Sequence, residues 1–165
     1  MATDMQFRTH RPGDIGYIIH RHGVLYSELC GWGTQFEGWV AQIMASFVAD
    51  HDPELERCWI AERDGRFQGS VVVCRAGGAA PDTARIRVLL VEPEARGLGL
   101  GRKLSQMCVD FARDRGFAKV TLVTQSNLTA ARAIYSSMGF TCVRRAPSEH
   151  FQSADSQEET WELQL

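Results

Sequence analysis

The chain has 165 residues, of which 44% are hydrophobic and 23% charged, and its formal net charge is -2. This length predicts one domain over residues 1–165, and the composition excludes disordered, collagen-like and coiled-coil classes. The near-neutral charge disfavours a nucleic-acid partner, and no apolar run approaches the roughly 20 residues of a membrane helix. With no recognisable N-terminal leader and no paired cysteine motif, we expect a cytoplasmic protein without a membrane partner, disulfide framework or metal site.

The first part of the chain is predicted to form a short edge strand at residues 7–9 and then two helices. The first helix begins near residues 11–14, where a proline and an acid suit a helix start, and is expected to end at Gly23. Thr34 and Glu37 match a capping box, in which hydroxyl and carboxylate satisfy free backbone N–H groups. This pattern predicts a second, core-facing helix from residue 34.

The next segments are predicted to be strands. Residues 57–63 and 67–75 flank Asp64 and Gly65, a pair that tolerates the positive φ of a tight turn, so they should form an antiparallel hairpin. Residues 83–91 are β-branched and apolar toward their end, which predicts a more central strand.

The second half alternates helices and strands, an order typical of a mixed α+β sheet. The predicted elements are a helix from residue 100 that stops before Gly116, a strand at 119–124, a helix at 127–138 closed by Gly139, a strand at 140–145, and a half-buried strand at 158–165.

A glycine-rich stretch follows the central strand, with Gly97, Gly99 and Gly101 at alternate positions before an amphipathic helix. Glycines there let the backbone approach a ligand and turn its N–H groups outward, and the helix N-terminus adds partial positive charge. Between residues 85 and 119 the chain carries eight basic residues against four acidic ones. The stretch therefore predicts a phosphate or pyrophosphate site.

Three other interpretations of these glycines were weighed. A P-loop needs a lysine and a hydroxyl residue directly after a glycine, and the chain has none there. A dinucleotide fingerprint needs the spacing G-x-G-x-x-G, whereas Gly97, Gly99 and Gly101 are evenly spaced. A glycine-rich turn without a ligand is the third.

Two motifs resemble those of the GNAT superfamily of acetyl-CoA-dependent N-acetyltransferases. The first is Q/R-x-x-G-x-G/A, met by Arg96, Gly99 and Gly101 after Val91 and Pro93. The second is a helix ending in tyrosine followed by Gly-Phe, met by Ala131, Ile134, Tyr135, Gly139 and Phe140. Residues 20–23 and 58–65 are also similar to the acetyltransferase halves of proteins that carry a MarR-type domain, although we expect no winged helix ahead of Phe7.

The resemblance implies a single-domain α+β fold: a mixed, mostly antiparallel sheet of six to seven strands, helices on both faces, and a splay after the central strand. It implies transfer of acetyl from acetyl-CoA to a primary amine of a small molecule or peptide by direct attack. The implied coenzyme contacts are Leu90, Val91, Arg96, Gly97, Leu98, Gly99, Gly101, Arg102, Lys103, Asn127, Ala131 and Tyr135. A non-catalytic acyl-CoA-binding or sensor module is the alternative.

The catalytic roles are less determined. Tyr135 holds the family position for thiolate protonation, with ring packing as the alternative, and a backbone N–H near Leu90 or Val91 is the expected oxyanion donor. Glu37 and His22 are candidate bases. A capping box would explain Glu37 equally well, and a histidine that ends an apolar stripe is more often packed or at the surface than a base. The remaining candidates are Glu92 and His150 as weaker bases, Asn127 as a helix cap, and Trp32 and Trp39 as pocket walls. The final strand leaves a homodimer by sheet pairing open.

Overall fold

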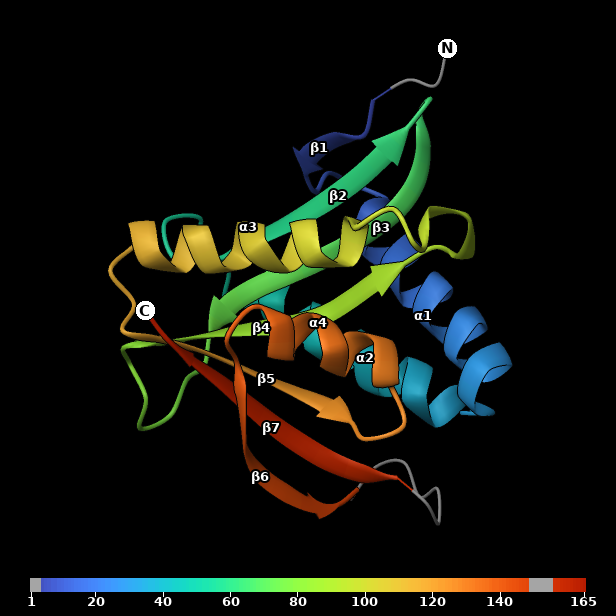
Figure 1. Ribbon diagram of the computed structural model, residues 1–165. Helices are drawn as coiled ribbons and strands as arrows, with labels where there is room; N and C mark the ends of the chain where they lie inside the picture. The colour runs from blue at the N-terminus through green and yellow to red at the C-terminus, as the bar shows by residue number, and fades with distance from the viewer. Residues whose placement is uncertain (1–3, 149–155) are drawn as a thin grey trace.

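A mixed sheet of seven strands forms the centre of the computed structural model, which describes residues 4–148 and 156–165 (Figure 1). The strands lie in the order β1-β2-β3-β4-β5-β7-β6, and every neighbouring pair is antiparallel except β4 and β5. Their bounds are β1 Gln6–Thr9, β2 Arg57–Arg63, β3 Arg66–Arg75, β4 Thr83–Val91, β5 Lys119–Gln125, β6 Thr141–Pro147 and β7 Gln157–Gln164. The α+β class and the mixed sheet are confirmed.

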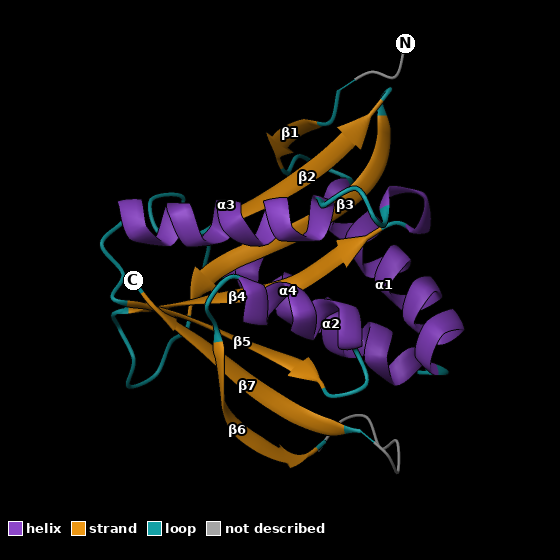
Figure 2. Ribbon diagram, viewed as in Figure 1, coloured by secondary structure: helices purple, strands orange, loops and turns teal. Residues whose placement is uncertain are grey.

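Four α-helices cover the two faces of the sheet within the described residues (Figure 2). They are α1 Asp14–Cys30, α2 Thr34–Ala49, α3 Leu100–Asp114 and α4 Thr129–Ser137, with a short 3₁₀ turn at Pro93–Ala95. The α1 and α2 side buries one apolar cluster, including Ile18, Val40 and Val72. The α3 side buries the other, in which Leu104 and Val73 are fully buried. Helices on both faces, as expected, enclose two cores around one sheet.

The hairpin and the helix ends after α3 and α4 form as the sequence predicts. Asp64 and Gly65 adopt φ values of 52° and 71° between β2 and β3, which matches a tight turn with two left-handed residues. Gly116 and Gly139 have φ values of 81° and 92°, the conformation that glycine adopts at little cost.

The expected end of the first helix at Gly23 is wrong, because α1 continues to Cys30 and ends before Gly31, which has φ 69°. A Cβ atom on Gly23 would lie 2.7 Å from Oε1 of Glu37, so the glycine lets the end of the Glu37 side chain lie against α1. The predicted capping box is also wrong. Helix α2 starts directly after Gly33 without a side-chain cap, and the Glu37 side chain packs toward α1 instead.

The expected splay between β4 and β5 is present. The two parallel strands pair only over Thr83–Ile86 and Lys119–Leu122, and beyond those residues they diverge (Figure 1). In the diverging half of β4 the register with β3 shifts by one extra residue, and Val88 there has φ 47°. A positive φ at a β-branched residue is a backbone outlier, and such bulges redirect a strand's main-chain groups.

The last strand, β7, lies inside the sheet because β5 and β6 pair with its two sides. The sequence-based idea that this strand pairs with a second copy is therefore wrong. The sheet edges within the described chain are β1 and β6. Among the helices of residues 4–148 and 156–165, none has the length and apolar character to cross a bilayer.

Candidate active site

A cavity of about 330 Å³ lies where β4 and β5 diverge. Side chains of both helical layers and of three strands line it. Those used below are His22 and Tyr26 of α1, Trp39 of α2, Arg85 and Arg87 of β4, Tyr135 of α4 and Glu158 of β7. The cavity is therefore a consequence of the splay, which opens the sheet from one face to the other.

The loop between β4 and α3 presents a row of free backbone N–H groups beside this opening. Gly97 and Gly99 have φ values of 74° and 76°, and Gly99 is the N-cap of α3 without a side-chain cap. Within the described chain, the amides of residues 97–102 donate no hydrogen bond, since the first helical bond runs from Lys103 N–H to the Gly99 carbonyl. Residues 96–99 are exposed. Exposed, unpartnered amides at a helix N-terminus suit an anion such as a pyrophosphate.

The third glycine of the motif also contributes to packing. A Cβ on Gly101 would lie 3.1 Å from Cδ1 of Ile134 in α4 and 3.6 Å from Cγ2 of Val91. Gly101 is buried, so it permits close packing of α3 against α4 and the end of β4. Gly97 and Gly99 have open space where a Cβ would lie, so a ligand can approach the backbone closely there.

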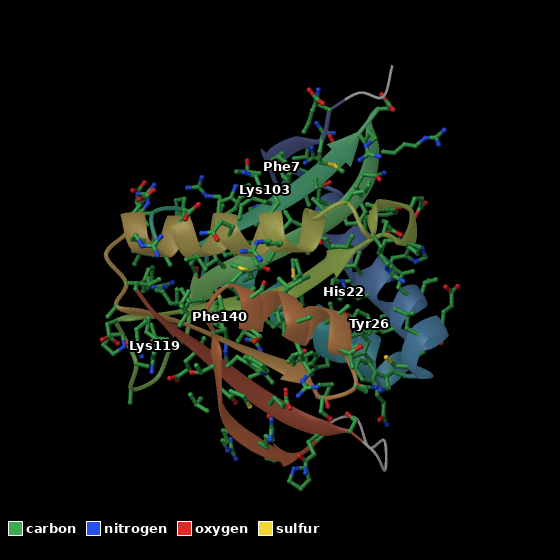
Figure 3. The ribbon with its side chains drawn as sticks, viewed as in Figure 1. Phe7, His22, Tyr26, Lys103, Lys119 and Phe140 are labelled. Atoms are coloured by element: carbon green, nitrogen blue, oxygen red, sulfur yellow. The ribbon has the colours of Figure 1, made fainter. Side chains whose placement is uncertain are left out.

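The basic residues of the motif spread around the loop. Arg96 is exposed, and Arg102 donates a hydrogen bond of 2.6 Å to Oγ of Ser137 in α4. Nζ of Lys103 lies 6.0 Å from the ring centre of Phe7 in β1 (Figure 3). Leu98 is 58% exposed and so presents an apolar side chain beside the free amides.

At the end of β4, Leu90 is buried and Val91 is half-buried, opposite Ser70 and Gly69 of β3. Beyond Ile86 this half of β4 has no pairing partner on the β5 side. Its outer main-chain groups therefore remain open to an extended guest or a developing negative charge.

Tyr135 lies in the cavity wall, 5% exposed, with its ring centre 5.8 Å from that of Phe140. Burial raises the pKa of its phenol well above the usual value, which keeps the hydroxyl protonated. That hydroxyl has no hydrogen-bond partner within residues 4–148 and 156–165. Ala131, one turn earlier on α4, lines the same cavity.

Asn127 is exposed in the turn before α4. The helix-cap interpretation of this residue is wrong, because Leu128 is the N-cap and no side chain caps the helix. The side chain thus remains available at the surface beside the cavity residue Leu128.

His22 and Tyr26 lie one turn apart on α1 and stack with ring centres 5.8 Å apart (Figure 3). The His22 Nδ1 atom is 2.8 Å from the Ile18 carbonyl oxygen, which assigns the proton of the neutral ring to Nδ1. Burial lowers the pKa of His22 from 6.5 to about 4, so the ring is neutral near pH 7. Burial likewise raises the pKa of Tyr26 to about 12.

The other predicted bases lie elsewhere. Glu37 is at the crossing of α1 and α2 and does not line the cavity. Glu92 is 5% exposed, accepts two hydrogen bonds from Arg21, of 2.6 and 2.8 Å, and does not line the cavity. His150 lies outside the described residues.

Three charged residues of the cavity were not predicted as site residues: Arg85, Arg87 and Glu158. Glu158 reaches the cavity because β7 inserts beside β5, where it pairs with Gln125. Arg85 and Arg87 stand at alternate positions of a strand whose end is apolar. This alternation in the sequence could have indicated that both side chains lie on one face of the sheet. Trp32 and Trp39 line the cavity, where the sequence analysis had placed them as walls of an acceptor pocket.

Comparison with known proteins gives one family match. The profile described as "Acetyltransferase (GNAT) family" matches residues 24–140. The probable N-acetyltransferase camello of Xenopus tropicalis is 34% identical over 122 residues, which are 70% of this chain and 52% of that protein. A mycothiol acetyltransferase of Cellulomonas flavigena is 41% identical over 88 residues, 49% of this chain and 25% of that protein. The chain thus spans about half or less of these curated relatives.

Solved structures share the fold. A GCN5-related N-acetyltransferase from Kribbella flavida superposes with a TM-score of 0.79 at 22% identity and covers 98% of both chains. The yncA protein of Salmonella typhimurium, solved with its cofactor acetyl-CoA, has a TM-score of 0.76 at 23% identity. That comparison covers 98% of this chain and 94% of the other.

Proposed function

Since the chain belongs to the acetyltransferase (GNAT) family, we propose that it transfers acetyl from acetyl-CoA to a primary amine. The observation that carries this proposal is the row of unpartnered amides at residues 97–102 beside a cavity that crosses the sheet. A phosphate site next to an open strand edge suits a molecule with a diphosphate and an extended arm.

The residues present fit such a molecule. The amides of residues 97–102 would bind the diphosphate, with Arg96 supplying charge at the exposed end of the loop. The unpaired half of β4, from Arg87 to Val91, would receive the arm through its open main-chain groups. Ala131 and Tyr135 of α4 would close the opposite wall.

Acetyl-CoA would supply an acetyl thioester, and the protein's own groups would manage the protons. An alkylammonium, with a usual pKa near ~10.4, must lose a proton before its nitrogen can attack a carbonyl carbon. Glu158 would be the base that accepts this proton. It lines the cavity and has no hydrogen bond or ion pair within the described chain. Its carboxylate also attracts the cation, which the neutral ring of His22 does not do.

Tyr135 would donate a proton to the departing thiolate, since burial keeps its phenol protonated and its hydroxyl is free. Main-chain N–H groups near Leu90 and Val91 would stabilise the negative charge on the carbonyl oxygen. The base is thus placed on β7 and the acid on α4, on different walls of one cavity. His22 would support the cavity wall beside Tyr26.

Several broader features belong to the same proposal. The acceptor is a small-molecule or peptide amine and the site of action is the cytoplasm. A homodimer, if formed by strand pairing, would use β1 or β6. We also propose that, within the family, the chain is most similar to the acetyltransferase halves of MarR-linked proteins. This proposal is based on residues 20–23 and 58–65.

The proposal is tested by calorimetry with acetyl-CoA and by release of free CoA in the presence of amines of several classes. We expect binding, acetyl transfer to at least one amine, and in Glu158→Gln a fall in kcat/KM of about 100-fold with unchanged coenzyme affinity. Glu162→Gln, on the same strand but paired with Lys119, serves as the matched control. Coenzyme binding without turnover of any amine would favour the non-catalytic module.

A further inference from the structure

Two arginines in the cavity have no counter-charge. Arg85 and Arg87 are two residues apart on β4, so both side chains lie on the same face of the sheet, and both line the cavity. Neither makes a hydrogen bond or ion pair within residues 4–148 and 156–165, and the buried Nε atom of Arg85 lacks a partner. Both residues are half-buried.

Three of the other half-buried arginines pair with carboxylates, whereas within the described residues Arg57 donates to the Pro53 carbonyl and Arg63 has no ion pair. Arg8 contacts Asp14 and Glu62, Arg21 contacts Glu92, and Arg132 contacts Glu159 at 2.9 Å. This contrast matters because a guanidinium taken partly out of water without a carboxylate has lost hydration and gained nothing in exchange.

The environment of Arg87 shows the same imbalance. Burial and the neighbouring Arg85 both lower the pKa of Arg87, and no carboxylate opposes them. Of the charged residues that line the cavity within residues 4–148 and 156–165, only Glu158 is acidic, and it lies opposite Gln125 near the far end of β5. The first half of β4 therefore presents two uncompensated positive charges.

The coenzyme phosphates are not the natural partner of this pair. Six residues separate Arg85 from the end of β4, a strand length of roughly 20 Å, and the phosphate-binding amides lie beyond that end. The pair also shares the cavity with the rings of Tyr26, Trp32, Phe36 and Trp39. An occupant there would meet two guanidinium groups on one side and aromatic rings on the other.

We infer that Arg85 and Arg87 bind a carboxylate of the amine acceptor, so that the acceptor is a free amino acid, or similar amino carboxylate, with an apolar side chain. The inference rests on the proposed function and narrows its substrate class. The acceptor's ammonium would face Glu158, its carboxylate the arginine pair and its apolar group the aromatic wall. A peptide N-terminus lacks a carboxylate next to its amine and would bind poorly.

The test uses three amines that share a benzyl group: L-phenylalanine, L-phenylalaninamide and phenethylamine, with spermidine as a polyamine reference. We expect the wild-type protein to acetylate L-phenylalanine with a kcat/KM about 100-fold above that of the amide or phenethylamine. Equal rates on acid and amide, or a preference for spermidine, would overturn the inference. These outcomes need no mutant, so they do not depend on how a variant folds.

The variants Arg85→Gln and Arg87→Gln sharpen the result. Each should reduce the ratio of kcat/KM for L-phenylalanine to kcat/KM for phenethylamine at least about tenfold. Arg144→Gln, an exposed residue of β6 outside the cavity, is the matched control and should change nothing. An unchanged acid preference in both variants would contradict the inference, whereas absence of acetyl transfer to every amine would contradict the proposed function itself.

Discussion

The proposed coenzyme side and the proposed acceptor side of the cavity are built in different ways. On the coenzyme side, one continuous segment, residues 97–102, offers main-chain N–H groups. On the acceptor side, single side chains come from α1, α2, β4 and β7. We therefore expect substitutions on the first side to act through backbone shape and bulk, and those on the second side to act through one functional group at a time.

The most severe loss is expected from Gly99→Trp. Gly99 has φ 76° and open space around it, so a large side chain would strain the backbone and cover the free amides. Loss of two or three charge-assisted hydrogen bonds predicts a decrease in acetyl-CoA affinity of about 1000-fold. Isothermal titration calorimetry measures this decrease directly.

Gly77→Trp provides the control for backbone strain. Gly77 also has φ 76°, is exposed, has open space around it, and lies in the loop between β3 and β4. The two variants should lose similar stability in thermal unfolding, but only Gly99→Trp should lose coenzyme affinity. If the affinities of both variants match that of the wild type, the phosphate site lies elsewhere.

An intermediate effect is expected from Tyr135→Phe. The substitution removes a hydroxyl group and retains the ring that packs near Phe140. Loss of a proton donor predicts a fall in kcat of about 100-fold with little change in acetyl-CoA affinity. Steady-state kinetics together with calorimetry separate the two quantities.

Tyr26→Phe makes the same chemical change on the other wall of the cavity. We expect kcat to change by less than about threefold in this variant, because α1 belongs to the acceptor side. A larger loss in Tyr26→Phe than in Tyr135→Phe would assign the proton donor to α1. The assignment of α1 to the acceptor side alone would then be wrong.

The smallest effect concerns pH and stability. The pKa of His22 is about 4 in the folded protein and near ~6.5 in an unfolded chain. Below pH 6.5 the unfolded state takes up a proton that the folded state refuses, so stability is complete above pH 6.5 and declines as the pH falls toward 4. Between pH 7.5 and 5 this difference amounts to about 2 kcal/mol in the free energy of unfolding.

Urea unfolding of wild type and His22→Gln at both pH values measures this contribution. The variant should lack about 2 kcal/mol of the wild-type decrease between pH 7.5 and 5. His20→Gln, an exposed histidine on the same helix, should retain the full decrease. Identical pH dependence in wild type and His22→Gln would show that the buried ring does not govern this decrease.

The sequence was most informative where structure depends on neighbouring residues. The glycine-rich turn at Gly97 and Gly99 before a helix could be predicted because left-handed backbone and a following helix are local features. Asp64 and Gly65 were also correctly predicted to form a hairpin turn. The strand of residues 83–91 was predicted with the bounds that the structure shows.

Residues whose role depends on distant partners were harder to assign. Gly23 looked like a helix end, but it lies inside α1, next to the Glu37 side chain of α2. Gly101 was predicted only as part of the phosphate site, and its packing against Ile134 of α4 could not be foreseen. Glu158 belongs to no sequence motif. It reaches the cavity because β7 lies between β5 and β6, and this strand order could not be predicted from neighbouring residues.

The short pairing between β4 and β5 has a consequence for the molecule as a whole. Only four residue pairs, from Thr83 with Lys119 to Ile86 with Leu122, join these two strands. An extended guest beside the free half of β4 would act as a temporary extra strand, bridging two parts of a divided sheet. Binding of the coenzyme would then also make the sheet more rigid, and release of the product would make the sheet more flexible again.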